Sequence, residues 1–251
     1  MKISIITVCY NSAVTIYDTI NSVNTQTHPN IEHIFIDGLS RDDTLNIINS
    51  NAQRNPIVIS ENDNGLYDAM NKGILLATGD IIGILNSDDI YENKNIISNI
   101  MNQIELCKVD SAYGDLIYTK SDDLNYIIRY WKSGNFNKKK FLFGWMPPHP
   151  TFFVKREIYI KHGLFNLKLK SSADYEIMLR FLYKKNISTI YLNEVLVKMR
   201  IGGKSNSSLI SRLKANREDR LAWKLNGLKS QGITFLFKPL RKILQYFWFR
   251  I

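Results

Sequence analysis

Cysteine and histidine are both scarce in this sequence. Its 251 residues include two cysteines, Cys9 and Cys107, and four histidines scattered along the chain. Two thiols cannot build a disulfide framework or a cysteine-rich zinc site, and the histidines lack the tight spacing of a zinc-binding helix. We therefore expect a reducing, cytoplasmic environment, with Cys9 as an ordinary buried strand residue.

Long hydrophobic runs and several nucleotide-binding motifs are also missing. No run of 18 or more apolar residues occurs, so we expect no transmembrane helix. The start, MKISIITVCYNS, shows no cleavage site of small residues, so we expect no signal peptide. The patterns GxGxxG, GxxxxGK[ST] and GxSxG are absent, which leaves dinucleotide-binding, P-loop and serine-elbow chemistry unsupported.

Charge is plentiful but unevenly distributed. The net charge is +10, and the 45% hydrophobic and 22% charged residues are ordinary globular values. Residues 1–106 carry 5 Lys and Arg against 13 Asp and Glu, whereas residues 107–251 carry 28 against 10. This asymmetry predicts a basic surface that meets an anion: nucleic acid, anionic lipid or a phosphorylated substrate.

Strand and helix signals alternate over the first hundred residues. Apolar β-branched runs predict buried strands, and amphipathic segments between them predict helices. This series predicts an α/β fold with a mixed, mostly parallel sheet flanked by helices. The expected strands are 3–9, 31–36, 57–60 and 81–85; the expected helices are 13–25, part of 40–52, and 66–77, the last with Gly79 as its C-cap.

The pattern changes after residue 106. A strand pair, a proline-rich loop, a helix and two further strands are expected before a long helix and a basic, aromatic tail. We therefore divide the chain into 1–106, 107–205 and 206–251. The expected elements are strands 111–118, 125–131, 151–154, 188–192 and 195–200, loop 145–150, and helices 172–184 and 209–228, followed by the tail 232–251.

Polar residues follow three of the expected strands. Tyr10 and Asn11, then Asp37, then residues 86–89 would meet at one edge of a parallel sheet, where such sheets bind ligands. Asp37 either binds a nucleotide base or ribose, or shapes an Asp-Gly turn.

The acids at the end of the fourth strand allow two interpretations. Asp88 and Asp89 suit a hard divalent cation, which prefers oxygen ligands and often binds substrate phosphates as well. Alternatively, one of them caps a helix near 92–105. The other acidic residues at the same sheet edge favour the metal.

Three stretches carry a family resemblance: ISIITVCYNS, FIDGLSRDDT and NGLYDAMNKGILLATGDIIGILNSDD. Over roughly residues 1–205 the chain resembles family 2 glycosyltransferases of the Rossmann-like GT-A fold. The resemblance implies transfer of a sugar, with inversion, from a nucleotide sugar (expected to be a UDP-sugar) to an acceptor hydroxyl. The chain is similar to bacterial enzymes of O-antigen, capsule or exopolysaccharide synthesis. This similarity implies a lipid-linked glycan acceptor at the inner face of the plasma membrane.

The resemblance also implies roles for individual residues. Asn86-Ser87-Asp88 occupies the family's DXD position, with Asn in place of the first acid. Asp88, supported by Asp89, would hold Mn²⁺ or Mg²⁺. Tyr67 lies on the helix that flanks the donor. The residues expected to contact the nucleotide sugar are Thr7, Tyr10, Asn11, Asp37, Asp68, Asn71, Lys72, Asn86, Asp88 and Arg200.

Asp174 matches the family's catalytic base, although Ala173 replaces the acid that usually precedes it. Inversion needs a base that takes the proton of the attacking hydroxyl; without the resemblance, Asp174 could simply cap the following helix. His149 and Trp145 are expected near the bound sugars, or as structural residues. Arg200, with the loop from Gly202 to Ser205 that includes Lys204, is expected to close over the diphosphate.

The C-terminal tail, and two departures from the family's motifs, leave alternative functions open. Residues 212–251 hold 10 Lys and Arg against two acids, which suits peripheral contact with an anionic membrane, or packing on the protein or a homodimer partner. Asn86 and Ala173 favour an inactive scaffold as an alternative. A metal-dependent nucleotidyltransferase would normally have a Gly- and Lys/Arg-rich loop where this chain has YNSAVT. Nucleic-acid binding leaves the acidic strand ends unexplained, so no nucleic-acid partner is expected.

Overall fold

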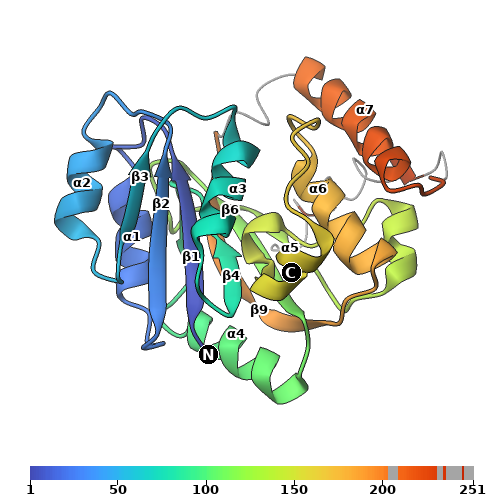
Figure 1. The fold of residues 1–251 in the computed structure, drawn as a ribbon, viewed down its shortest axis with the longest axis horizontal. Helices are drawn as coiled ribbons and strands as arrows, with labels where there is room; N and C mark the ends of the chain where they lie inside the picture. The colour runs from blue at the N-terminus through green and yellow to red at the C-terminus, as the bar shows by residue number, and fades with distance from the viewer. Residues whose placement is uncertain (203–208, 231–233, 236–244, 246–251) are drawn as a thin grey trace.

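The computed structural model describes residues 1–202, 209–230, 234–235 and 245 (Figure 1). These residues form a nine-stranded mixed sheet in the order β3-β2-β1-β4-β8-β6-β9-β5, with β7 paired to β6. The expected mixed sheet is confirmed. The strands are β1 (Ile3–Cys9), β2 (Ile31–Asp37), β3 (Ile57–Ser60), β4 (Ile81–Ile84), β5 (Asp89–Tyr91), β6 (Ser111–Thr119), β7 (Ile127–Trp131), β8 (Phe153–Lys155) and β9 (Thr189–Arg200).

Parallel pairing governs the N-terminal half of the sheet. β1 lies between β2 and β4 and is parallel to both, and β3 is parallel to β2. The carboxyl ends of these four strands therefore meet at one edge. β8 is antiparallel to both β4 and β6, so the sheet continues from residues 1–106 into residues 107–205.

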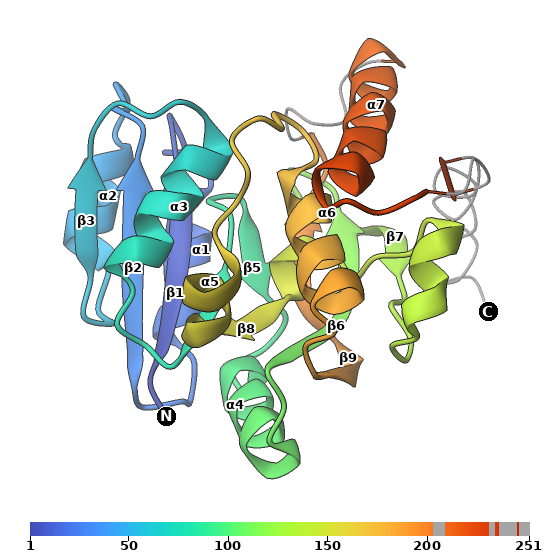
Figure 2. The ribbon, with the colours of Figure 1, turned by 45° about the vertical axis from the view of Figure 1, so that its right-hand side comes forward.

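Helices cover both faces of the sheet (Figure 2). Side chains of β1 alternate between the faces: Ile3 and Ile5 share a cluster with α4, whereas Ile6 and Val8 share one with α3. The helices are α1 (Ile16–Asn24), α2 (Thr44–Asn51), α3 (Leu66–Leu76), α4 (Ile96–Cys107), α5 (Arg156–His162), α6 (Ala173–Met178) with its π-helical continuation η3 (Leu179–Lys184), and α7 (Leu209–Leu225), with short 3₁₀ turns η1 (Lys138–Phe143) and η2 (His149–Thr151).

Two local expectations are wrong, and one alternative is excluded. The strands expected at 188–192 and 195–200 form one strand, β9. α4 begins after Asn95, and Asp89 starts β5, so neither Asp88 nor Asp89 caps this helix. Gly79 is not the C-cap of α3, because α3 ends at an extended Ala77. A Cβ at position 79 would lie 2.6 Å from the Ser4 backbone nitrogen, so glycine permits close packing on β1.

The C-terminal expectations fall largely outside the described residues. α7 confirms a helix within 209–228. Most of the tail 232–251, and the segment with Lys204 and Ser205, lie outside the described ranges. Among the helices within those ranges, none is both long and apolar enough to cross a membrane.

Glu32 joins three segments at the opposite edge of the sheet. Its carboxylate is almost fully buried and accepts hydrogen bonds from Lys2 Nζ at 2.6 Å, Ser4 Oγ at 2.5 Å, and Thr78 N at 2.7 Å. Burial alone would raise the pKa of Glu32, but these hydrogen bonds outweigh it and lower the pKa to about 2. The side chain therefore links β1, β2 and the loop before β4 as an anion.

We expect Glu32→Gln to reduce stability in a pH-dependent way. Because the native pKa lies below the unfolded value, the stabilisation is complete above about pH 4.5 and is lost as the pH falls toward 2. The variant should lose about 1–3 kcal/mol of unfolding free energy at pH 7. Its unfolding free energy should also fall less steeply than that of the wild type as the pH decreases. Urea denaturation at pH 7, 4 and 3 measures both. Glu157→Gln is the exposed control; parallel pH curves for the wild type and Glu32→Gln would contradict the assignment.

Candidate functional site

Two helices bring Tyr67 and Asp174 together. Each residue lies in the first turn of its helix, α3 or α6, and the Tyr67 hydroxyl donates a hydrogen bond to Asp174 Oδ1 at 3.0 Å. Because α3 follows the carboxyl end of β3, this contact places Asp174 at the ligand-binding edge of the sheet. Burial, and then the charge of Asp174, raise the pKa of Tyr67, so its hydroxyl keeps its proton at neutral pH.

Phe165 and His149 border this pair. Phe165 stacks on Tyr67 with ring centres 5.5 Å apart and an interplanar angle of 24°, and His149 meets Phe165 edge-on at 5.6 Å. Burial lowers the pKa of His149 although the charge of Asp174 opposes the shift, so the imidazole is neutral at pH 7. Trp145 is a core residue: it is buried, and its indole N–H donates to the Ser133 carbonyl at 2.9 Å.

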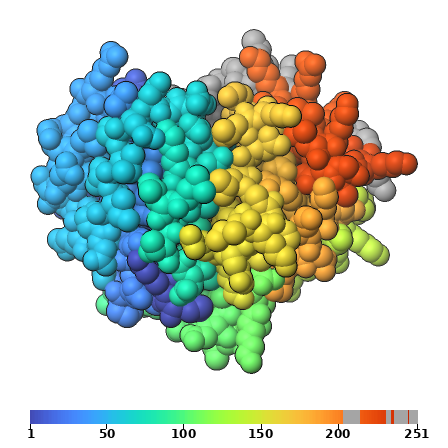
Figure 3. Space-filling model, viewed as in Figure 1, coloured from blue at the N-terminus to red at the C-terminus, as the bar shows by residue number. Residues whose placement is uncertain are grey.

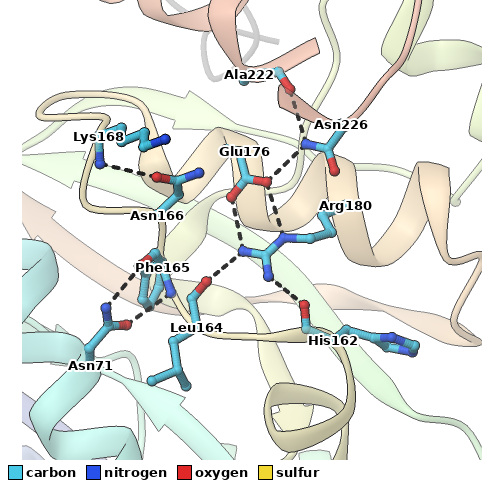
Figure 4. Close-up of polar contacts among 10 residues, drawn as sticks. All are labelled: Asn71, His162, Leu164, Phe165, Asn166, Lys168, Glu176, Arg180, Ala222 and Asn226. Atoms are coloured by element: carbon cyan, nitrogen blue, oxygen red, sulfur yellow. Dashed lines mark hydrogen bonds and ion pairs between the residues drawn. The ribbon is translucent and has the colours of Figure 1, made fainter. Parts of the chain in front are cut away.

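Asn71 holds the segment that carries Phe165 (Figure 4). Its Nδ2 donates to the Phe165 carbonyl and its Oδ1 accepts from the Phe165 backbone N–H, both at 2.9 Å. Both polar groups of the side chain are thus paired with one backbone residue. The side chain joins α3 to the segment before α6, which gives Asn71 a structural role, and its contact with the nucleotide sugar stays a prediction.

Arg180 holds the same segment from the other side (Figure 4). Its guanidinium donates to the carbonyls of His162 at 2.5 Å and Leu164 at 2.6 Å. Glu176 fixes the guanidinium through two hydrogen bonds, at 3.0 and 2.9 Å, and also accepts from Asn226 Nδ2 at 2.9 Å. The buried ion pair therefore connects α6, the residue after α7 and the chain leaving α5.

In the space-filling view, α3 and the chain between α5 and α6 lie against each other along one surface (Figure 3). A small hollow lies beside Tyr67 at this boundary. It is lined by residues 64–68 together with Leu167, Leu169 and Lys170.

Asp37 shapes the loop after β2. The side chain is fully buried and accepts hydrogen bonds from Ser40 N at 3.0 Å, Ser40 Oγ at 2.5 Å and Ser60 Oγ at 2.7 Å. The Cys9 thiol approaches Oδ1 at 3.8 Å. Both carboxylate oxygens therefore have donors from the protein. These contacts support the turn interpretation, and contact of Asp37 with a nucleotide stays a prediction.

The residues that end β1 divide into buried and exposed. Thr7 is fully buried and its Oγ1 lies 2.9 Å from His33 Nε2. Its contact with a nucleotide stays a prediction. Tyr10 is half exposed beside the loop after β2. Asn11 has a left-handed φ of 49°, and its Oδ1 accepts from the Arg41 N–H at 2.9 Å. Tyr10 and Asn11 thus stay at the sheet edge, where the sequence predicts them.

Asp68 and Lys72 organise the loop between β3 and α3. Asp68 accepts from the Asn64 N–H at 2.9 Å, as an acid in the first turn of a helix commonly does. Lys72 Nζ donates to the Asn62 carbonyl and pairs with Glu61, both at 2.7 Å. Both residues lie at the edge of the sheet where a nucleotide-sugar donor is expected, but the contacts that they make here are with other groups of the protein.

Asp89 is enclosed at the start of β5. It is fully buried, and its Oδ2 accepts from Asn86 Nδ2 at 2.8 Å. Within the described part of the chain its Oδ1 has no hydrogen-bond partner. Burial, and then the charge of Asp88, raise the pKa of Asp89 well above its usual range. Asp89 is thus more enclosed than Asp88, and its role in supporting a metal stays a prediction.

Arg200 anchors the turn that contains Asp88. It is 7% exposed, pairs with Asp18, and donates to the main-chain carbonyls of Asp88 at 2.9 Å and Ser121 at 3.2 Å. These three acceptors occupy its guanidinium here, and the binding of a diphosphate by Arg200 stays a prediction.

Asp88 is the acid of this turn that fits a metal. Its carboxyl is half-buried, and burial raises its pKa. Among the described residues, no three His, Cys, Asp or Glu side chains cluster as a metal site. Mg²⁺ commonly takes only one or two protein carboxylates and completes its shell with water and substrate phosphates. The residues therefore fit a divalent cation that Asp88 holds alone and that a phosphorylated ligand completes.

Comparison with known sequences identifies related proteins. The model of the family described as "Glycosyl transferase family 2" matches residues 4–163. A PGL/p-HBAD biosynthesis glycosyltransferase of Mycobacterium tuberculosis is 29% identical over 209 residues, which cover 81% of this chain and 79% of that protein. An uncharacterized glycosyltransferase of the same species is 31% identical over 180 residues, covering 71% and 68%.

Solved structures share the fold. TarS 1–349 of S. aureus, in complex with UDP-GlcNAc, has a TM-score of 0.72 at 18% identity; the match covers 90% of this chain but only 65% of that one. The mannosyltransferase PcManGT of Pyrobaculum calidifontis, in complex with GDP-Man and Mn²⁺, has a TM-score of 0.66 at 17% identity and covers 98% and 69%. The GT-A fold expected from the sequence is confirmed.

Replacing Asn71 with alanine tests its structural role. Loss of the side chain leaves the buried N–H and carbonyl of Phe165 unpaired, which should lower the unfolding free energy by about 2–4 kcal/mol. Asn102→Ala, an exposed position in α4, is the matched control and should change stability by less than about 0.5 kcal/mol. Denaturant titration measures both. A stable Asn71→Ala protein with weakened nucleotide binding would support the ligand-contact role.

Proposed function

Because the chain belongs to glycosyltransferase family 2, we propose that it transfers a sugar from a UDP-sugar to an acceptor hydroxyl with inversion. The observation that carries the mechanism is the position of Asp174. The hydrogen bond from Tyr67 occupies Oδ1 and leaves Oδ2 outside this contact, at the sheet edge where ligands bind.

In this mechanism Asp174 acts as the general base. Its Oδ2 takes the proton of the acceptor hydroxyl while the acceptor oxygen attacks the anomeric carbon from the face opposite the leaving group. The new carbon–oxygen bond forms as the bond to the nucleoside diphosphate breaks, and the bonding electrons leave with the diphosphate. A single displacement of this kind inverts the configuration.

The donor side of the proposal rests on the turn at the end of β4. Asp88 is the residue that would hold Mn²⁺ or Mg²⁺, and the cation would offset negative charge on the departing diphosphate. Asn86 holds the neighbouring Asp89, and Arg200 fixes the backbone of Asp88. Complexes of related folds with UDP-GlcNAc and with GDP-Man and Mn²⁺ support a nucleotide-sugar donor and a metal.

We also propose that the acceptor is a lipid-linked glycan of bacterial surface polysaccharide synthesis, reached at the cytoplasmic face of the membrane. The support is the charge of residues 212–251, with 10 Lys and Arg against two acids. Each basic residue near an anionic bilayer contributes about 1 kcal/mol of attraction. A homodimer stays a prediction from the sequence.

Calorimetric titration with UDP, GDP and dTDP, each with Mn²⁺ or EDTA, tests the donor site. We expect UDP to bind in a metal-dependent way and Asp88→Ala to weaken this binding at least tenfold. The alanine variant should keep its fold, because Arg200 bonds to the main chain at position 88. Asp122→Ala, an exposed acid, is the control. Equal UDP affinity in EDTA would overturn the metal role, and stronger GDP or dTDP binding would overturn the UDP assignment.

Asp174→Asn tests the base. Sugar transfer should fall by about 10²–10⁴-fold, because the amide cannot accept the proton, while UDP affinity stays unchanged. Product analysis separates the alternatives: sugar transfer releases a nucleoside diphosphate, whereas nucleotidyl transfer releases pyrophosphate. A variant as active as the wild type would exclude Asp174 as the base, and a wild type that binds no nucleotide would favour the inactive scaffold.

A further inference from the structure

Tyr67 and Asn71 share one side of α3, one helical turn apart, and both reach the same stretch of chain. Asn71 binds the backbone of Phe165, and the Tyr67 hydroxyl binds the side chain of Asp174. α3 therefore contacts both the chain before α6 and the first turn of α6. The contact made by Asn71 is structural, whereas the contact made by Tyr67 is with the carboxylate that we propose as the base.

We propose that Tyr67 is a positioning residue that holds Asp174 in one side-chain conformation, with Oδ2 directed at the acceptor hydroxyl. The inference rests on the proposed function. An aspartate side chain at the start of a helix can occupy several rotamers, and a hydrogen bond donated to one carboxylate oxygen selects among them. Proton transfer requires the base within hydrogen-bond reach of the hydroxyl, so the selected rotamer determines the rate.

The surroundings of Tyr67 suit this role. The ring is 9% exposed and stacks on Phe165, whose backbone Asn71 fixes on both sides. The phenol therefore has little freedom to leave Asp174. Its hydroxyl carries one proton, and the carboxylate at 3.0 Å is the acceptor for it. Phenylalanine at position 67 would keep the ring and its stacking and remove the hydroxyl, which donates to the Asp174 carboxylate and accepts from the Asp174 backbone.

The experiment compares Tyr67→Phe with Tyr113→Phe. Tyr113 is a matched control, because it is fully buried and its hydroxyl donates to the Gly134 carbonyl at 2.8 Å, away from Asp174. We expect Tyr67→Phe to lower kcat by about 10–100-fold, since a small misplacement of a reacting group costs up to about 10²-fold. KM for both substrates and UDP affinity should change less than threefold, and Tyr113→Phe should keep the wild-type kcat.

A second arm combines Tyr67→Phe with Asp174→Asn. If Tyr67 acts through Asp174, its substitution should cause no further loss of kcat once the base is gone. Equal kcat for Tyr67→Phe and Tyr113→Phe, or additive losses in the double variant, would overturn the inference and leave the proposed function intact. A wild type that transfers no sugar from any nucleotide sugar would overturn the function, and the inference with it.

Discussion

Buried backbone must find hydrogen-bond partners, and the chain between α5 and α6 cannot find them in a helix or a sheet. Side chains supply them instead. Asn71 binds Phe165, and Arg180 binds the carbonyls on either side of residue 163. Glu218 of α7 accepts the N–H groups of residues 171 and 172, at 2.7 and 3.1 Å. Three helices thus fix the chain that delivers Asp174 to the sheet edge.

The sequence predicts much of the N-terminal half of this fold because β1 and β4 are buried along their whole length. A strand enclosed on both faces reads as a nearly continuous apolar run, so the limits of β1 are readable from the sequence alone. β9 is different, because Asn193 and Glu194 interrupt its apolar pattern. Its continuity comes from pairing with β6, across register shifts near Asp115, and no local signal reports that pairing.

The site was harder to predict than the sheet, since a residue type does not reveal its partner. An acid at a strand end, such as Asp37, or an amide on a helix, such as Asn71, fits a ligand or a protein group equally well, and in this structure both side chains bind the protein. Tyr67 and Asp174 are 107 residues apart in sequence, so their hydrogen bond exists only in the folded chain. Arg200 shows the same limit: its charge suits a diphosphate, but Asp18 and two carbonyls hold it.

Arg200 holds the turn after β4 through the main chain of the turn. The guanidinium binds the main-chain carbonyl of residue 88 and leaves the side chain at that position outside the anchor. Any amino acid at position 88 presents the same carbonyl to Arg200, so a substitution there changes the side chain that the turn offers to a ligand and keeps this main-chain contact.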